Sequence, residues 1–497
     1  MAAGDDAGPA RGICGGRCPV DARGGTLATM PPLPHRRAVL QGLAATALAS
    51  ATPDALAGRR RPNVLFISID DLNDWVGILG GHPQARTPNI TRLARRGMAF
   101  ENAHCAAPAC NPSRTAVLTG LRPSTSGVYG NDQAWRPVLP KAVTLPQLFR
   151  RNGYTAVGSG KVFHFGDPSS WDAYHPDACE RPPDRPRATP SDSALVNIES
   201  IRFGPSRASR DGVMSDRHVA RFIESELGRK HDGPFFLACG FFKPHLPWHV
   251  PEKYYDLHPL DGIVLPEVEP GDLDDIPEAG RRMARVQTHR ALVRKKAWRA
   301  AVQGYLAALS FADAMLGRVL DALDASAYRD DTVVVLWSDH GWALGEKFHW
   351  KKFALWEECT RVPLVFSGPG VEKGLCRRPV NLVDIYPTLA ELCRLSAPAR
   401  LDGASLVPLL QDSRAAWDRP SLTTHGHGNH ALRDERWRYI RYADGSEELY
   451  DHDSDPSEFR NVASRPELAD VKARLAAHLP TVDSPPAPHQ RGTCRTG

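Results

Sequence analysis

Short apolar runs, rich in β-branched and aromatic residues, recur along the chain, and polar residues follow them directly. Three of these runs end in residues with catalytic potential: residues 63–69 before Asp70 and Asp71, residues 332–338 before Asp339 and His340, and residues 235–242 before Lys243 and His245. Such runs predict buried β-strands. Because ligands of open α/β sheets bind beyond the carboxyl ends of the strands, these polar residues are predicted to lie in a binding site.

Segments with apolar residues at helical spacing lie between the runs, and residues 87–97 and 303–323 are the clearest of them. Alternating strands and helices predict an α/β fold with a mostly parallel central sheet flanked by helices. Residues 176–212 and 266–290 have no apolar period. We expect both of these stretches to be long surface insertions near a site.

The pattern changes from about residue 400. Residues 437–461 alternate around Asp444-Gly445, as in an antiparallel hairpin. This predicts a smaller C-terminal α+β domain with an antiparallel sheet. The expected division of the chain is an N-terminal extension over residues 1–57, a catalytic domain over 60–400, the smaller domain over 401–485, and a loosely ordered tail over 486–497.

The N-terminal extension carries a twin arginine, Arg36-Arg37, before a short apolar run that ends at Ala57. This pattern predicts a signal peptide, and the twin arginine resembles the signal for export of folded proteins into the bacterial periplasm or beyond. The run is too short and too rich in alanine to predict a stable membrane span. Translation from Met30 would leave a short charged region before the signal. The alternative interpretation is a disordered tail on a cytoplasmic protein.

Composition excludes some classes of function. A chain of 497 residues with 42% hydrophobic and 24% charged residues is globular and buries a large core. Its net charge of +5, without a sustained Lys/Arg tract, argues against nucleic acid as a partner. Ten scattered cysteines do not form a disulfide framework, although one or two bridges stay open.

The adjacent carboxylates of Asp70 and Asp71 repel each other unless a cation joins them. Oxygen ligands suit Ca²⁺ or Mg²⁺, and Asp339 and His340 can complete the same site. An imidazole is an unusual ligand for Ca²⁺, so these residue types leave the ion's identity open. Alternatively, the two aspartates cap the helix that follows them.

Cys110 stands in CNPSR, a setting that favours a helix N-terminus over a core position. Free N–H groups there, together with Arg114, gather negative charge and predict an oxyanion site. In one alternative Cys110 pairs with Cys105 in a disulfide or a metal site. In another it is an inert buried thiol.

Several basic residues occur in three further motifs. They are Lys161 and His164 in GKVFH, Lys243 and His245 in FFKPHLPW, and Lys347, His349, Lys351 and Lys352 in KFHWKKF. Cations and imidazoles that converge around a metal are what cleavage of an anionic ester requires. Taken singly, each is more often solvated, and His218, Lys347, His349 and Lys351 are expected outside the reacting centre. The sequence leaves two alternatives for the histidines of THGHGNH, His425, His427 and His430. Either they contact the substrate or they have no part in the site.

With these motifs the chain resembles the type I sulfatases of the alkaline phosphatase superfamily, most closely the iduronate-2-sulfatase group. The resemblance runs in order through RPNVLFISIDDL, CNPSRTAVLTG, GKVFH, FFKPHLPW, SDHGWALGE and LYDHDSDPSEFRN. CNPSR fits the C-x-P-x-R signature of the family. Substrate selectivity comes from regions where the resemblance is weakest, so iduronate specificity is not inferred.

The resemblance implies a catalytic role for each matching residue. A formylglycine-generating enzyme would oxidise Cys110 to Cα-formylglycine, whose hydrate attacks sulfur and expels the alcohol. The implied metal ligands, for Ca²⁺ or else Mg²⁺, are Asp70, Asp71, Asp339, His340 and residue 110. The other implied roles are Arg114 at the diol, Lys161 and Lys352 at the sulfate, His164 as base and His245 as leaving-group acid. The choice of Lys352 over Lys351 rests on spacing after Trp350.

The expected function is therefore an exported sulfuric ester hydrolase that acts on a sulfated carbohydrate. A phosphate or phosphonate ester hydrolase is the alternative within the same superfamily. An alternative of another class is a non-catalytic protein that binds sulfated glycans and in which Cys110 stays a thiol.

Overall fold

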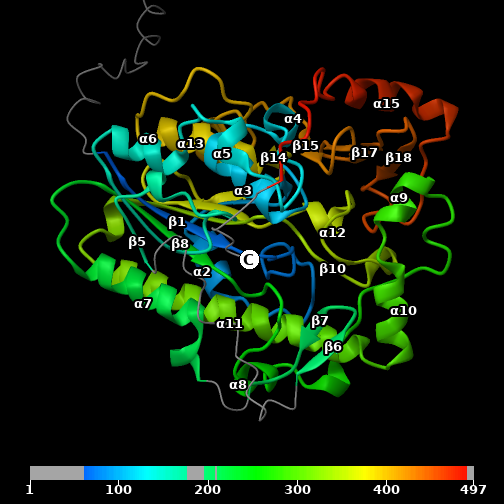
Figure 1. Cartoon of the computed structure of the whole chain (residues 1–497), viewed down its shortest axis with the longest axis horizontal. Coiled ribbons are helices and arrows are strands. Elements are labelled where there is room, and N and C mark those ends of the chain that lie inside the picture. The colour runs from blue at the N-terminus through cyan, green and yellow to red at the C-terminus, as the bar shows by residue number, and fades with distance from the viewer. Residues whose placement is uncertain (1–60, 176–194, 207–209, 490–497) are drawn as a thin grey trace, which may run out of the picture. The chain divides into compact units, whose positions relative to one another are not determined.

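The computed structural model describes residues 61–175, 195–206 and 210–489 (Figure 1). These described residues belong to one compact unit. The predicted signal peptide lies outside the described residues, as do most of the insertion at 176–212 and the last residues of the tail. Within the described ranges, every helix is too short or too polar to span a bilayer.

A central sheet of eight strands organises the fold, and it is mostly parallel as predicted. Across the sheet the strands are β13 (Gly374–Cys376), β2 (Gly97–Phe100), β12 (Leu364–Ser367), β9 (Thr332–Ser338), β1 (Asn63–Ile69), β8 (Phe235–Phe241), β4 (Thr155–Gly160) and β5 (Ala173–His175). Only β12 runs antiparallel to its two neighbours. The predicted α/β class is confirmed.

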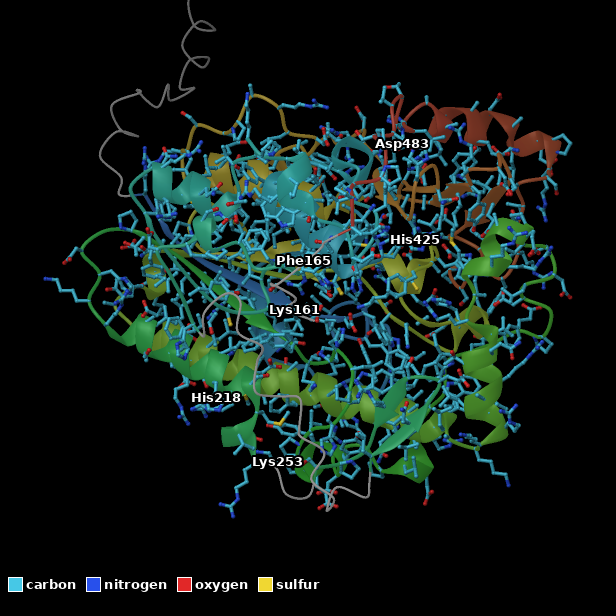
Figure 2. The ribbon with its side chains drawn as sticks, in the orientation of Figure 1. Lys161, Phe165, His218, Lys253, His425 and Asp483 are labelled. Atoms are coloured by element: carbon cyan, nitrogen blue, oxygen red, sulfur yellow. The ribbon has the colours of Figure 1, made fainter. Side chains whose placement is uncertain are left out.

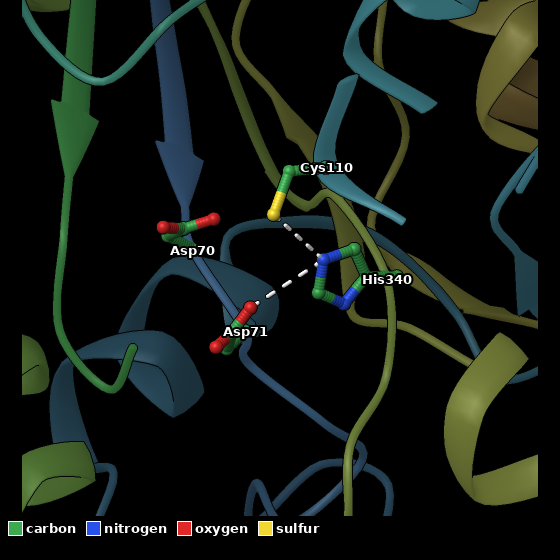
Figure 3. Close-up of side chains that lie close together, drawn as sticks. All are labelled: Asp70, Asp71, Cys110 and His340. Carbon is green, nitrogen blue, oxygen red and sulfur yellow. Dashed lines mark hydrogen bonds and ion pairs between the residues drawn. The ribbon is translucent and has the colours of Figure 1, made fainter. Parts of the chain in front are cut away.

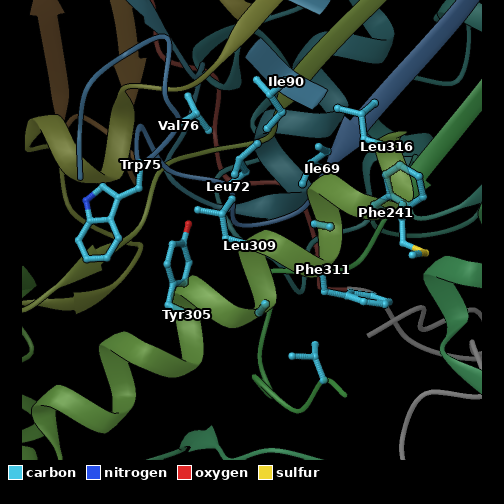
Figure 4. Packing of buried hydrophobic residues seen from close by; sticks show 14 of the residues in the cluster. Ile69, Leu72, Trp75, Val76, Ile90, Phe241, Tyr305, Leu309, Phe311 and Leu316 are labelled. Atoms are coloured by element: carbon cyan, nitrogen blue, oxygen red, sulfur yellow. The ribbon is translucent and has the colours of Figure 1, made fainter. Parts of the chain in front are cut away.

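Helices cover both faces of this sheet, so alternate residues of each strand enter different cores (Figure 1). The helices on one face are α2 (Pro88–Arg95), α7 (Ser215–Gly228) and α11 (Trp298–Ala325), and those on the other face include α3 (Cys110–Thr119), α6 (Leu145–Arg151) and α13 (Ile385–Leu392). In β1, Leu65 and Ile67 pack with the first group and Phe66 with the second. Figure 4 shows Leu309 of α11 pointing toward Leu72, just after β1.

Shorter elements connect these layers. The short strands are β3 (Ala103–His104) with β14 (Val380–Asn381), β6 (Val196–Ile198) with β7 (Ile201–Phe203), and β10 (Ala343–Leu344) with β11 (Trp350–Lys351). The short helices are α4 (Pro123–Ser126), α5 (Trp135–Val138), α8 (Glu252–Tyr255), α9 (Glu278–Met283), α10 (Val286–Arg294), α12 (Glu357–Thr360) and α14 (Val407–Gln411).

Regular structure within the two expected insertions was not predicted. The β6–β7 hairpin forms in the first, because Ile201 and Phe203 bury their side chains in the core around α11. Helix α9 and the first part of α10 form in the second, and Leu292 of α10, two residues beyond it, is fully buried. Isolated apolar residues thus anchor segments whose sequence has no clear period.

The C-terminal part contains the predicted antiparallel sheet. Its strands are β15 (Ser421–Thr424), β16 (His430–Arg433), β17 (Trp437–Arg441) and β18 (Glu447–Asp451), followed by α15 (Ala469–Ala476). Asp444-Gly445 lies between β17 and β18, and Gly445 has a φ of 84° that suits glycine in a hairpin turn.

Arg438 of β17 links this sheet to the loop before β12. It is buried, forms ion pairs with Glu357 of α12 and with Glu458, and donates to the Leu355 carbonyl at 3.1 Å. The backbone N–H of Glu357 also donates to Glu458 at 3.0 Å. Because all these groups lie out of water, each charge depends on its partners.

Arg438→Met is therefore expected to lower the free energy of unfolding by about 3–5 kcal/mol, since it removes the buried cation that pairs with both Glu357 and Glu458. Arg436→Ala is the matched control, because Arg436 pairs with Asp451 at the surface and is 51% exposed. This control should cost about 0–1 kcal/mol. Urea unfolding of both variants measures the difference, and equal losses would contradict the network.

Candidate active site

Four neighbouring parallel strands deliver the predicted polar residues to one edge of the central sheet. Their order is β9, β1, β8 and β4. The residues that follow them are, in the same order, Asp339 and His340, Asp70 and Asp71, Lys243 and His245, and Lys161 and His164. The strand order thus brings residues from distant parts of the chain into one site.

Cys110 is the first residue of α3 and faces this edge (Figure 3). Its Sγ lies 2.9 Å from Lys352 Nζ, 3.3 Å from His340 Nε2 and 3.9 Å from Lys161 Nζ. The predicted helix N-terminus is confirmed, but every residue of α3 is also buried. The sequence offered a helix N-terminus and a core position as alternatives for Cys110. In the structure Cys110 has both properties.

Arg114, one turn further along α3, joins three strand ends. Its Nε donates to Asp339 Oδ2 at 2.9 Å, its Nη2 to Asp70 Oδ1 at 3.1 Å, and its Nη1 to the Lys161 carbonyl at 2.6 Å. The side chain is fully buried. The guanidinium is thus held by acceptors of the protein itself.

Two lysines compensate the carboxylates next to Cys110. Lys161 Nζ lies 2.5 Å from Asp70 Oδ2, and Lys352 Nζ lies 2.6 Å from Asp71 Oδ1. The structure places Lys352, and not Lys351, beside the cysteine. Burial alone would raise the pKa of Asp70, but neighbouring charges, with Lys161 first, hold it well below its ordinary value. In the same way Lys161 and Lys352 outweigh burial and lower the pKa of the Cys110 thiol.

The backbone at Asp71 explains how adjacent aspartates face one site. Asp71 has a φ of 61°, a left-handed backbone conformation that residues other than glycine seldom adopt. The Tyr305 hydroxyl of α11 donates to its carbonyl and accepts from the Asn73 N–H, each at 2.9 Å. Sequence reasoning missed Tyr305, whose only signal is a hydroxyl within an otherwise apolar helix face.

The donor set fits a divalent cation. Ligand atoms of Asp70, Asp71, Cys110 and His340 all lie within 4.8 Å of one another. His340 Nδ1 donates to the Gly341 carbonyl at 2.9 Å, which leaves Nε2 facing the group. Asp71 Oδ2 is buried and has no hydrogen-bond partner among the described residues. A cation would satisfy this oxygen.

Asp339, the remaining predicted ligand, lies beside this group. Its Oδ2 is 3.4 Å from His340 Nε2 and accepts from Arg114. Burial raises the pKa of Asp339 to about 7, against the lowering charge of Arg114.

Both predicted acid–base histidines, His164 and His245, are half-buried. His164 is close enough to Cys110 for its side chain to interact with the thiol, and burial lowers its pKa. His245 Nε2 lies 3.8 Å from Asp71 Oδ2, and its side chain is 35% exposed. His245 therefore forms the solvent side of the site, whereas Lys161 and Lys352 are both 6% exposed.

Other residues singled out in the sequence lie elsewhere. Lys347 pairs with Asp272 at 2.7 Å, His349 contacts the Lys352 carbonyl at 3.1 Å, and His430 pairs with Asp483 at 2.9 Å. Cys105 is a free, buried thiol. The proposed pairing of Cys105 with Cys110 is therefore absent from the structure.

A second group of potential metal ligands consists of Glu357, His452 and Glu458. Arg438 forms ion pairs with both carboxylates, and Arg433 lies 3.6 Å from Glu357. Arginines of the protein thus already compensate the negative charges of Glu357 and Glu458. We interpret this group as a structural ion-pair network and not as a metal site.

Comparison with known families decides between the classes of function. The chain matches the sulfatase family over residues 62–395 and the family of the C-terminal part of N-sulphoglucosamine sulphohydrolase over residues 345–484. The chain is a type I sulfatase of the alkaline phosphatase superfamily. As a sulfatase it belongs to enzymes that hydrolyse sulfate esters, which argues against the non-catalytic alternative.

Individual relatives agree with this assignment. The sulfatase is 38% identical over 459 residues to a sulfatase of Formosa agariphila, with 85% of this chain and 87% of that protein covered. It is 32% identical over 404 residues to iduronate 2-sulfatase of Homo sapiens, with 71% of each covered. Its fold is similar to that of a phosphonate monoester hydrolase from Silicibacter pomeroyi, with a TM-score of 0.71, 22% identity, and 84% and 94% of the two chains covered.

Asp71→Asn is expected to weaken the binding of a divalent cation by at least about tenfold, because it removes a negative charge from the donor set. Asp74→Asn is the matched control, since Asp74 instead pairs with Arg361 at 3.2 Å. Calorimetric titrations with Ca²⁺ and with Mg²⁺ measure both variants and show which ion the sulfatase prefers. Unchanged affinity in Asp71→Asn would rule out this cation site.

Proposed function

We propose that this sulfatase releases inorganic sulfate from a sulfated carbohydrate, with residue 110 at the reacting centre. The observation that carries the proposal is the environment of Cys110. Its Sγ lies next to the amines of Lys352 and Lys161 and the imidazole of His340, at the buried end of the central strands. Such fixed positive charges stabilise the charge that develops as a sulfate ester is cleaved.

We propose further that a formylglycine-generating enzyme converts Cys110 to Cα-formylglycine. Once hydrated, this group supplies the hydroxyl that attacks sulfur. The position of Cys110 at the start of a buried helix supports the proposal, because a group built there is held rigidly against the site. The side chain is 1% exposed, so the modification has to precede folding.

The residues around position 110 would divide the work. Lys161 and Lys352 would hold sulfate oxygens, since their amines point at residue 110. His164, half-buried beside residue 110, would move the proton when sulfate leaves. His245 would protonate the departing alcohol, because its side chain is 35% exposed and so can reach a bound carbohydrate.

Ca²⁺ is the proposed cation, with Mg²⁺ as the alternative, because two carboxylates dominate the donor set of Asp70, Asp71, residue 110 and His340. A bound cation supplies a Lewis acid that polarises the attacking and sulfate oxygens. Asp339 would lie beside the cation, and its carboxylate would hold the Arg114 guanidinium in place.

We also propose export, on the basis of Arg36-Arg37 and the apolar run up to Ala57. Export in a folded state requires Cys110 to be modified beforehand in the cytoplasm.

The first test replaces the reacting residue. Cys110→Ala is expected to lower sulfate release by about a thousandfold or more, because no nucleophile is left at position 110. Cys105→Ala, which removes another buried thiol five positions earlier, should keep most of the activity. The mass of the peptide around residue 110 must also show the aldehyde in active protein. Full activity with an unmodified thiol would overturn the mechanism.

The second candidate function is hydrolysis of phosphate or phosphonate esters, which the fold of the Silicibacter enzyme favours. The charges at the site favour a monoanion, because Lys161 and Lys352 are each already paired with a carboxylate. A phosphate monoester carries about two negative charges at pH 7, in contrast to the single charge of a sulfate ester.

We therefore expect kcat/KM for a sulfate ester to exceed that for the matched phosphate monoester by at least about tenfold. A phosphonate monoester, which is also a monoanion, is measured as the third substrate with the same leaving group. Faster turnover of either phosphorus ester than of the sulfate ester would replace the proposed reaction with the alternative.

A further inference from the structure

Phe353, directly after Lys352, carries cations on its ring. The Arg285 guanidinium lies 5.4 Å and Lys352 Nζ 5.9 Å from the ring centre, and the His425 ring lies 6.1 Å away. Lys352 Nζ also lies 2.9 Å from Cys110 Sγ. The Phe353 ring therefore lies next to the Lys352 amine, which is proposed to hold the sulfate. The Arg285 guanidinium lies beside the same ring, at the edge of the site.

Lys351 is a further cation in the same segment of the chain as Phe353. Its amine donates to Ser200 in the turn of the β6–β7 hairpin. Arg285 lies next to this segment, because its backbone N–H donates to His349 Nδ1 at 3.1 Å. Burial, together with the charges of Arg285, Lys352 and Arg202, lowers the pKa of Lys351 to about 8, so Lys351 stays mostly protonated at pH 7. Within the described ranges, no carboxylate forms an ion pair with Lys351, Arg285 or Arg202.

The local backbone separates the two adjacent lysines. Lys351 has a φ of 77° and Phe353 a φ of 79°, both in the left-handed region. With these turns Lys352 points to Cys110, whereas Lys351 points to the β6–β7 hairpin. Strained conformations of this kind persist where the surrounding structure enforces them, and they often occur at binding sites.

His425 offers a polar group at the same place. Its Nδ1 is buried and has no hydrogen-bond partner among the described residues. Burial lowers the pKa of His425 to about 4, so the ring is neutral at pH 7. The loop is held close to the site, because the Thr424 N–H donates to the Ala106 carbonyl at 2.9 Å. Figure 2 shows His425 on the side of Lys161 that faces the C-terminal sheet.

An aromatic face, a neutral imidazole without a partner and unpaired cations form a combination that suits an anionic sugar. We propose that Phe353, His425, Arg285 and Lys351 form a subsite for a second anionic group of the substrate, either a carboxylate or a further sulfate. This inference rests on the proposed function, in which Lys161 and Lys352 hold the sulfate that is cleaved. The substrate class is thereby narrowed to saccharides with at least two anionic groups.

The test compares three saccharides that carry the same cleavable sulfate. One has no other charge, the second carries a carboxylate on the neighbouring sugar, and the third carries a second sulfate there. The wild type is expected to prefer the doubly charged saccharides. Arg285→Ala and Lys351→Ala should each lower this preference, the ratio of the kcat/KM values, by about 10- to 100-fold, chiefly through a higher KM.

Matched variants separate this role from a loss of structure. Arg285→Lys and Lys351→Arg should restore part of the preference, because they keep the charge. Arg290→Ala removes an exposed arginine of α10, five residues from Arg285, and should leave the preference at the wild-type value. A loss limited to the carboxylate or to the second sulfate identifies which of the two the subsite binds.

An unchanged preference in Arg285→Ala and Lys351→Ala, or a wild type without any preference, would overturn the subsite. Failure of the proposed function looks different, because the wild type would then cleave none of the three saccharides. In that case calorimetric binding of the doubly charged saccharides decides. The subsite stands if Arg285→Ala and Lys351→Ala weaken that binding about tenfold or more, and it falls if they do not.

Discussion

The ion pairs of Arg114 with Asp70 and Asp339 are the interaction on which the site depends. Three buried carboxylates, those of Asp70, Asp71 and Asp339, meet at the ends of β1 and β9. Carboxylates without partners in such a place would be very costly, because burial removes the water that solvates their charge. Arg114 bridges two of them from α3, so the helix that presents Cys110 is tied to the sheet by charge as well as by packing.

The same balance of charge prepares the site for chemistry. Lys161 and Lys352 compensate Asp70 and Asp71, and both amines also face residue 110. Charges fixed in this way need no reorganisation when negative charge moves during a reaction. The left-handed backbone of Asp71, held by Tyr305, aims the second carboxylate at the same point. The contacts that stabilise the fold here are thus the same ones that the proposed reaction uses.

The proposed subsite and the proposed reacting centre come from different parts of the chain. The strand ends supply the acidic residues. Arg285 comes from the second insertion, Lys351 from the end of β11, and His425 from the loop between β15 and β16. The loop that carries Lys351 and Lys352 is followed by Glu357, which Arg438 holds from β17. The C-terminal sheet therefore supports the rim of the site from outside the central fold, where variation leaves the reacting centre intact.

The sequence by itself determined the local features. Apolar runs closed by aspartates predicted β1 and β9, CNPSR predicted the start of α3, and Asp444-Gly445 predicted the hairpin, because each depends on neighbouring residues. The spacing after Trp350 favoured Lys352 over Lys351, and Lys352 is the lysine that contacts Cys110. Only the tertiary structure decided that the donors of Arg114 are taken by strand ends and that Asp71 is left-handed. These outcomes arise from contacts between segments far apart in the chain, such as Tyr305 with Asp71, and no local pattern encodes them.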